Sequence, residues 1–127
     1  MDKKKSETGL TIRKEILGRE QVENMMADAD EFSRPLHEMI NEFAFGTIWA
    51  RPELPRKIRS LVNLGILTAL NRPRELKGHL RAALNNGCTK EEIREVLLQT
   101  IAYCGFPAAV DGFHTAREVF AELESKK

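Results

Sequence analysis

A glutamate and a histidine are spaced so that one helix would bring them together for acid–base chemistry. In the stretch RPRELKGHLRAALNNG, residues 72–87, Glu75 and His79 stand four positions apart. Such positions are neighbours on a helix, where a carboxylate can orient an imidazole and raise its pKa for general acid or base catalysis. The same spacing is typical of a surface pair that adds about 0.2–0.5 kcal/mol to a helix. Spacing alone leaves both interpretations open.

Two arginines are candidates for binding an anion. Arg59 lies in RKIRSLVNLGILTAL, residues 56–70, whose apolar character predicts a central helix buried on several sides. A buried guanidinium needs an anionic partner, either a carboxylate of the protein or a ligand. Arg51 follows Trp49 in WARP, at the start of a proline-containing segment that predicts an irregular connection. Arg51 is therefore either a solvated loop residue or a residue that closes over a carboxylate.

The cysteines and the other histidines give weaker signals. Cys88 and Cys104 are too few for a disulfide framework, and their spacing fits no metal motif. Cys104 continues the apolar stripe of its expected helix, where a cysteine packs as a small hydrophobe, and no adjacent histidine supports a nucleophile. His114, one turn after Val110, faces either a pocket or solvent, and His37 is expected at the surface. We predict a reduced, cytoplasmic protein.

The composition limits the class of protein. The 127 residues suffice for one compact domain, and 42% apolar and 31% charged residues are typical of a globular chain. The formal net charge of +1 gives no reason to expect nucleic acid or an anionic membrane as a partner. No apolar run approaches a membrane span, and the start MDKKKSETG lacks a hydrophobic signal segment.

The hydrophobic periodicity is helical nearly throughout, which predicts an all-α domain of about six or seven helices. The expected domain covers residues 9–123, between flexible ends at residues 1–8 and 124–127. Helices are expected over 9–17, 20–29, 33–46, 56–70, 73–86, 90–104 and from after Gly105 and Pro107 to about 123. The fifth begins with Pro73 and ends at a left-handed Gly87, and Thr89 with Glu92 forms a capping box for the sixth.

Three motifs together carry a resemblance. They are W-x-R-P at 49–52, E-x-x-x-H-x-x-x-A-x-x-x-G at 75–87 and Y-C-G-x-P-A-A at 103–109. With FHTAREVF further on, they make the chain resemble the carboxymuconolactone decarboxylase family of the AhpD-like superfamily, from about Gly9 to Phe120. The resemblance implies a single AhpD-like helical domain that forms homotrimers or homohexamers and uses no cofactor or metal.

The resemblance also implies an activity, the decarboxylation of 4-carboxymuconolactone to the β-ketoadipate enol-lactone in the protocatechuate branch of aromatic degradation. The departing carboxylate is vinylogous to the lactone carbonyl, so the substrate is its own electron sink. We expect His79, oriented by Glu75, to deliver the proton, and arginines to bind the carboxylates. The expected substrate-binding set is Arg51, Arg59, Trp49 and Tyr103, with Cys104 and His114 as further pocket candidates.

Two alternatives stay open beside the decarboxylase. AhpD-like relatives carry C-x-x-C-x-x-x-H, and alignment on His79 places their cysteines at Arg72 and Glu75, so this chain lacks both sulfurs. The first alternative is a thiol oxidoreductase or peroxidase that relies on Cys104 instead. The second is an oligomer of the same fold that binds a small molecule without catalysis.

Overall fold

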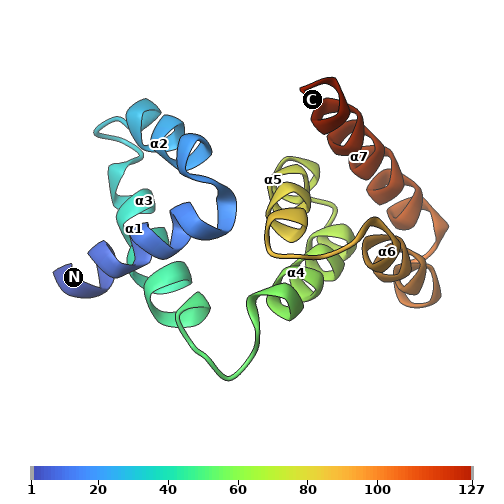
Figure 1. The fold of residues 1–127 in the computed structure, drawn as a ribbon, viewed down its shortest axis with the longest axis horizontal. Helices are drawn as coiled ribbons and strands as arrows, with labels where there is room; N and C mark the ends of the chain where they lie inside the picture. Colours follow the sequence, from blue (N-terminus) through green and yellow to red (C-terminus); the bar gives the residue numbers. More distant parts are fainter. Residues whose placement is uncertain (1, 127) are drawn as a thin grey trace. The chain divides into compact units, whose positions relative to one another are not determined.

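The computed structural model describes residues 2–126, and these form seven α-helices and one π-helix without a strand (Figure 1). The helices are α1 (Lys3–Leu17), α2 (Arg19–Asp28), α3 (Arg34–Met39), the π-helix η1 (Ile40–Trp49), α4 (Arg56–Leu70), α5 (Pro73–Asn85), α6 (Lys90–Cys104) and α7 (Phe106–Ser125). The all-α prediction is confirmed. Met1 and Lys127, the outermost residues of the ends expected to be flexible, lie outside the described residues.

The chain divides into two compact units, unit 1 up to Arg56 and unit 2 from Lys57 onward. Unit 1 contains α1, α2, α3 and η1, and unit 2 contains α5, α6, α7 and nearly all of α4. Within residues 2–126, each helix is too short or too polar to cross a membrane.

Helix α1 begins at Lys3, well before the expected start at residue 9. The reason is a cap, because the Asp2 carboxylate accepts a hydrogen bond from the backbone N–H of Lys5 at 3.1 Å. Residues 3–8 of the segment expected to be flexible therefore belong to a helix, and their mobility stays a prediction. Gly18, with φ 102°, separates α1 from α2 as the sequence predicts.

The helix expected over 33–46 is present but continues to Trp49 as η1. Gly46 does not end the helix because the glycine is needed for close packing against α1. A Cβ at Gly46 would overlap the backbone carbonyl of Lys5, and a Cβ at Gly9 would overlap that of Asn41. Unit 1 is therefore built around a helix crossing that excludes side chains at these two glycines.

The buried guanidinium of Arg13 lies at the centre of unit 1. It donates to the Asn41 side-chain oxygen at 3.0 Å and to His37 Nδ1 at 3.4 Å, and it lies 5.9 Å from the ring centroid of Phe45. The expectation of a surface histidine at position 37 is wrong, because His37 is half-buried as an acceptor for Arg13.

The core of unit 2 forms where α4 to α7 meet, and α7 packs against both α5 and α6. The predicted α5 stripe is confirmed, since Leu76, Leu80 and Ala83 are buried and Leu84 is partly buried. The largest fully buried apolar side chains here are Leu64, Leu80, Ile93, Leu97 and Val119. Burial of such a side chain contributes about 1.5–3 kcal/mol, so this cluster fixes the rotation of all four helices.

Helix α4 has the predicted bounds but is not buried on several sides. Its buried residues are Ser60, Leu64 and Thr68, whereas four apolar residues spaced four apart are exposed. This exposed α4 stripe consists of Ile58, Val62, Ile66 and Leu70. The core of unit 2 receives only the side of α4 that carries Leu64, which is why the prediction was wrong.

The junction of α6 and α7 is partly as expected. Thr89 and Glu92 form the predicted capping box, and Gly105, with φ 90°, ends α6. Pro107 does not break the chain but lies in the first turn of α7, where its missing N–H costs no helical hydrogen bond. Cys104 is exposed, so the prediction that it packs in the core is wrong.

Candidate active site

Helix α5 positions Glu75 and His79. Pro73 begins the helix, and the apolar side of the helix that carries Leu76 and Leu80 is buried in the core of unit 2. The two polar residues precede these leucines by one position each, at the edge of the stripe. Glu75 is consequently exposed, whereas His79 is half-buried.

The environment of His79 lowers the pKa of its imidazole below the usual 6.5. The main cause is burial, which disfavours the charged form, and the nearby Glu75 carboxylate raises the pKa by a smaller amount. The sequence predicted that Glu75 would raise the pKa of the imidazole, but the net change is a decrease, so this prediction is wrong. Burial thus favours the neutral form of His79 in the protein without ligand, and an orienting role of Glu75 stays a prediction.

Arg59 belongs to the same unit as His79, on the first part of α4. It is half-buried, not enclosed by apolar neighbours as expected. The residue as a whole keeps some solvent exposure although its Nε is buried, so burial does not by itself require a bound anion.

The other two candidates from the W-x-R-P motif lie in unit 1. Trp49 is buried at the end of η1 and stacks on Phe45, with ring centroids 6.1 Å apart and an interplanar angle of 14°. Arg51 is exposed and forms an ion pair with Glu53 at 3.2 Å. Trp49 is thereby a core residue of unit 1, and Arg51 is held beside it by its own N–H bond to the Ile48 carbonyl at 3.1 Å.

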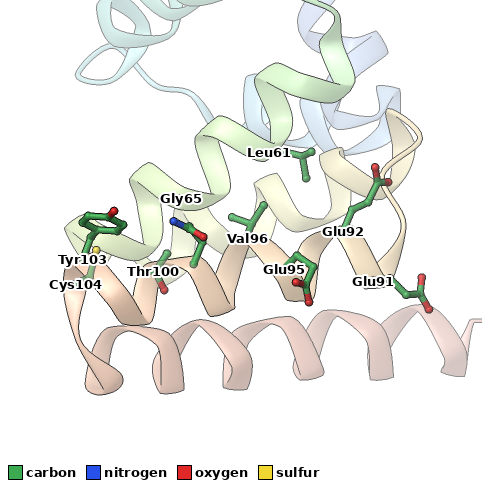
Figure 2. A pocket seen from close by; sticks show the side chains of 10 residues that line it. Leu61, Gly65, Glu91, Glu92, Glu95, Val96, Thr100, Tyr103 and Cys104 are labelled. Atoms are coloured by element: carbon green, nitrogen blue, oxygen red, sulfur yellow. The ribbon is translucent and has the colours of Figure 1, made fainter.

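Tyr103 and Cys104 line a different feature, a groove of about 610 Å³ between α4 and α6. In Figure 2 these two residues lie at one end of the groove and Glu91 and Glu92 lie at the other. The groove contains none of Glu75, His79 and Arg59. His114 is exposed on α7 and is not among the groove residues.

The groove does not suit a dianionic ligand. Its lining includes the apolar Leu61 and Val96 together with Glu91, Glu92 and Glu95, and it contains no basic side chain. Glu91 and Glu95 would repel the two carboxylates of such a ligand, whereas Glu92 is paired with Lys57 at 3.0 Å. We therefore do not expect the predicted chemistry in this groove.

Sequence reasoning did not find this groove, although one residue signals it. Gly65 lies inside α4, where a glycine is unfavourable by about 1 kcal/mol relative to alanine. A Cβ there would stand 4.0 Å from Val96 Cγ1, so the glycine leaves open the space that becomes the groove. Among residues 2–126, no three histidine, cysteine, aspartate or glutamate side chains gather closely enough to hold a metal ion.

Comparison with known proteins identifies the family. The sequence profile described as "Carboxymuconolactone decarboxylase family" matches residues 34–118, which run from unit 1 into unit 2, so both units belong to one family domain. A 4-carboxymuconolactone decarboxylase from Acinetobacter baylyi is 42% identical, over 96% of this chain and 91% of that protein. A nitrosuccinic acid decarboxylase from Metarhizium robertsii is also 42% identical, over 93% of this chain and 82% of that protein. An uncharacterised 15.0 kDa protein from Paracoccus denitrificans is 37% identical over 67% of this chain. By its motifs, its helical architecture and these matches, the chain belongs to the carboxymuconolactone decarboxylase family.

Proposed function

We propose that this protein is a carboxy-lyase that converts 4-carboxymuconolactone to the β-ketoadipate enol-lactone and CO2, in the protocatechuate branch of aromatic degradation. The observation that carries the proposal is the 42% identity to the Acinetobacter baylyi enzyme across 96% of the chain. The half-buried His79 beside the Glu75 charge supplies a titratable group suited to the proton transfer.

The reaction needs a place for two electrons and one proton. When the C–C bond to the leaving carboxylate breaks, its electron pair moves through the C=C bond into the lactone carbonyl and gives a dienolate. The dienolate then takes a proton on carbon. A dianionic substrate thereby becomes CO2 and a monoanionic product, and one proton is consumed.

His79 is our proposed source of that proton. Burial lowers the pKa of the imidazole and favours its neutral form in the free protein. A bound dianion favours the imidazolium, so binding raises the pKa of His79 and draws a proton from solvent, which the dienolate carbon then receives. Glu75 acts in the same direction through its charge.

The arginines have the complementary task of binding the carboxylates. Arg51 after η1 is exposed, and Arg59 on α4 is half-buried with a buried Nε. A guanidinium binds a carboxylate through two parallel hydrogen bonds, which fix its orientation as well as its position. Trp49 and Tyr103 stay predictions from the resemblance alone, since Trp49 is buried within unit 1 and Tyr103 lines the groove.

A second candidate substrate is nitrosuccinate, because the Metarhizium robertsii nitrosuccinic acid decarboxylase is equally identical to this chain. Nitrosuccinate also has two carboxylates, and its nitro group takes the electron pair released with CO2, as the lactone carbonyl does. The same arrangement of basic groups and a proton donor would serve either substrate.

One assay decides between these candidates. Purified protein is incubated with 4-carboxymuconolactone or with 2-nitrosuccinate, the loss of substrate absorbance is followed, and the product is identified by NMR. We expect turnover of the lactone and its disappearance in His79→Ala, which also excludes a contaminating enzyme. Faster turnover of nitrosuccinate would transfer the proposal to the second substrate.

The two remaining alternatives have their own readouts. A melting shift with 4-carboxymuconolactone but without turnover would favour a non-catalytic binder. Reduction of peroxide or disulfide that is lost in Cys104→Ser would favour a thiol oxidoreductase. We expect neither activity in place of decarboxylation.

We further propose that the protein is a cytoplasmic homotrimer or homohexamer. The support for assembly is the exposed α4 stripe (Ile58, Val62, Ile66 and Leu70), because contiguous exposed apolar surface commonly marks an interface. The support for the compartment is that Cys88 and Cys104 are free thiols. Light scattering coupled to size-exclusion chromatography should give a trimer or hexamer for wild type and a smaller mass for Val62→Glu.

A further inference from the structure

We propose that Asn86 and Ser60 are positioning residues, which hold the helix turn that carries Arg59 against the end of the helix that carries His79. This inference rests on the proposed function, since it assigns Arg59 and His79 to one reaction. Neither Asn86 nor Ser60 is itself expected to touch the substrate.

The first observation is a hydrogen bond between two chain segments of unit 2. The Asn86 side-chain amide donates to Ser60 Oγ at 3.0 Å, although the two residues are 26 positions apart. Ser60 is completely buried, so the bond forms where water does not compete with it. Loss of Asn86 would take this donor from the buried Ser60 hydroxyl.

Two further contacts join the same segments. The Cys88 thiol donates to the Lys57 carbonyl oxygen at 3.5 Å, and the Lys57 ammonium lies 3.0 Å from a Glu92 carboxylate oxygen. Glu92 is itself fixed by the capping box that begins α6. The start of α4 therefore contacts residues 86–92 through three groups: the Ser60 hydroxyl, the Lys57 carbonyl and the Lys57 ammonium.

These contacts lie next to the two helices that carry Arg59 and His79. Arg59 lies between Lys57 and Ser60 in the attached turn of α4. Asn86 directly follows α5, and its backbone N–H donates to the Ala82 carbonyl at 2.8 Å. His79 stands about two helical turns earlier on the same helix. The Asn86–Ser60 bond thus connects the C-terminal end of α5 to the turn of α4 that carries Arg59.

The contribution to catalysis follows from the precision that the reaction needs. If Arg59 holds a substrate carboxylate while His79 delivers a proton, a shift of α4 along α5 misplaces the substrate relative to the imidazole. A misplacement of about 1 Å by a change remote from the chemistry can lower a rate by about 100-fold. The bond is remote from the reacting atoms and yet affects their geometry.

The test compares kcat and KM for 4-carboxymuconolactone in wild type, Asn86→Ala, Ser60→Ala and the double variant. We expect kcat/KM to fall by about 10- to 100-fold in each single variant. The double variant should be no worse than either single variant, because both remove the same bond. Asn86→Asp should retain most of the activity, since the Ser60 hydroxyl can donate to the new carboxylate. The matched control is Asn24→Ala on α2, an exposed asparagine of unit 1.

A purely structural role is excluded by a second cycle. Arg59→Met is combined with Asn86→Ala, and all variants are assayed well below their melting temperatures, measured by circular dichroism. If Asn86 positions Arg59, Arg59→Met costs much less kcat/KM in the Asn86→Ala background than in wild type. If the effects of Arg59→Met and Asn86→Ala on kcat/KM multiply fully, or if Asn86→Ala and Ser60→Ala leave the kinetics unchanged, the positioning role is wrong. The proposed function is unaffected by either outcome. No turnover by wild type would overturn the proposed function and this inference together.

Discussion

The groove between α4 and α6 and the exposed edge of α5 differ in both shape and chemistry. The groove is the larger hollow, about 610 Å³, but its lining consists of apolar residues and three glutamates. The α5 edge instead carries the half-buried His79, whose pKa is lowered. We therefore propose the catalytic region at the α5 edge on the basis of charge and titration, and not on the volume of the groove.

The difference has a physical origin. A groove arises wherever two helices are left without a third one to cover them, and α4 leaves a whole apolar stripe exposed. A perturbed pKa arises only where a titratable group is partly withdrawn from water or placed next to a charge. If catalysis belongs to the α5 edge and not to the groove, substitutions at α5 should lower kcat and substitutions in the groove should not.

The largest expected effect separates the two regions directly. His79→Ala should lower kcat for 4-carboxymuconolactone by about 10²–10⁴-fold, because it removes the proposed proton donor. Glu95→Gln in the groove should leave kcat unchanged. Steady-state kinetics of both variants check this comparison, and a larger loss in Glu95→Gln would move the active site to the groove.

A smaller effect is expected for the anion-binding arginine. Arg59→Met keeps an unbranched stem but removes the guanidinium group and its charge. Since a hydrogen bond to a charged group contributes about 1.5–3 kcal/mol, kcat/KM should fall by about 10- to 100-fold. Arg51→Met should lower it similarly, and Arg19→Met on α2 serves as the surface control. Kinetics at wild-type values in folded Arg59→Met would remove Arg59 from the site.

The pH dependence of kcat/KM tests the role of His79 without abolishing activity. If protonated His79 is required, kcat/KM is highest below the pKa of His79 in the free protein, which lies below 6.5, and falls as the pH rises through it. The Glu75 charge raises that pKa, so Glu75→Gln should move the falling limb to lower pH. NMR titration of the His79 ring measures the same pKa independently. A limb that moves to higher pH would contradict the assignment.

The smallest effect concerns stability and the attachment of α5 to α7. The Glu122 carboxylate lies 2.7 Å from the Lys77 ammonium and also pairs with Arg81, and these hydrogen bonds lower its pKa from 4.5 to about 2. The pairing therefore stabilises the fold fully above about pH 4.5 and is lost as the pH falls through 2. Glu122→Gln should lower Tm at neutral pH and flatten the decrease of Tm between these pH values. Thermal unfolding at several pH values checks this, with Glu91→Gln as control.

Much of the fold could be predicted from local patterns. The bounds of α4, the proline start of α5 and the Thr89–Glu92 capping box depend on neighbouring residues, and a sequence displays these directly. The all-α class and the family also followed from motifs within the chain.

What could not be predicted depends on contacts between distant segments. Gly46 has the appearance of a helix end and serves instead as a point of close packing against α1. The burial of His37 is due to Arg13, which lies 24 positions away. The pKa of His79 depends on how deeply α5 sits in unit 2, and spacing to Glu75 indicates only one of its two causes. Exposure of the α4 stripe likewise depends on which helices reach it.

The crossing of α1 and η1 has a consequence for the W-x-R-P motif. Because the backbones meet at Gly9 and Gly46, η1 cannot slide along α1 by one residue without forcing a side chain into a backbone carbonyl. Trp49 lies three residues after Gly46 and ends the same helix. The two glycines thus fix the position of η1 along α1, and with it the point from which the chain presents Arg51, whose own N–H bonds to the Ile48 carbonyl.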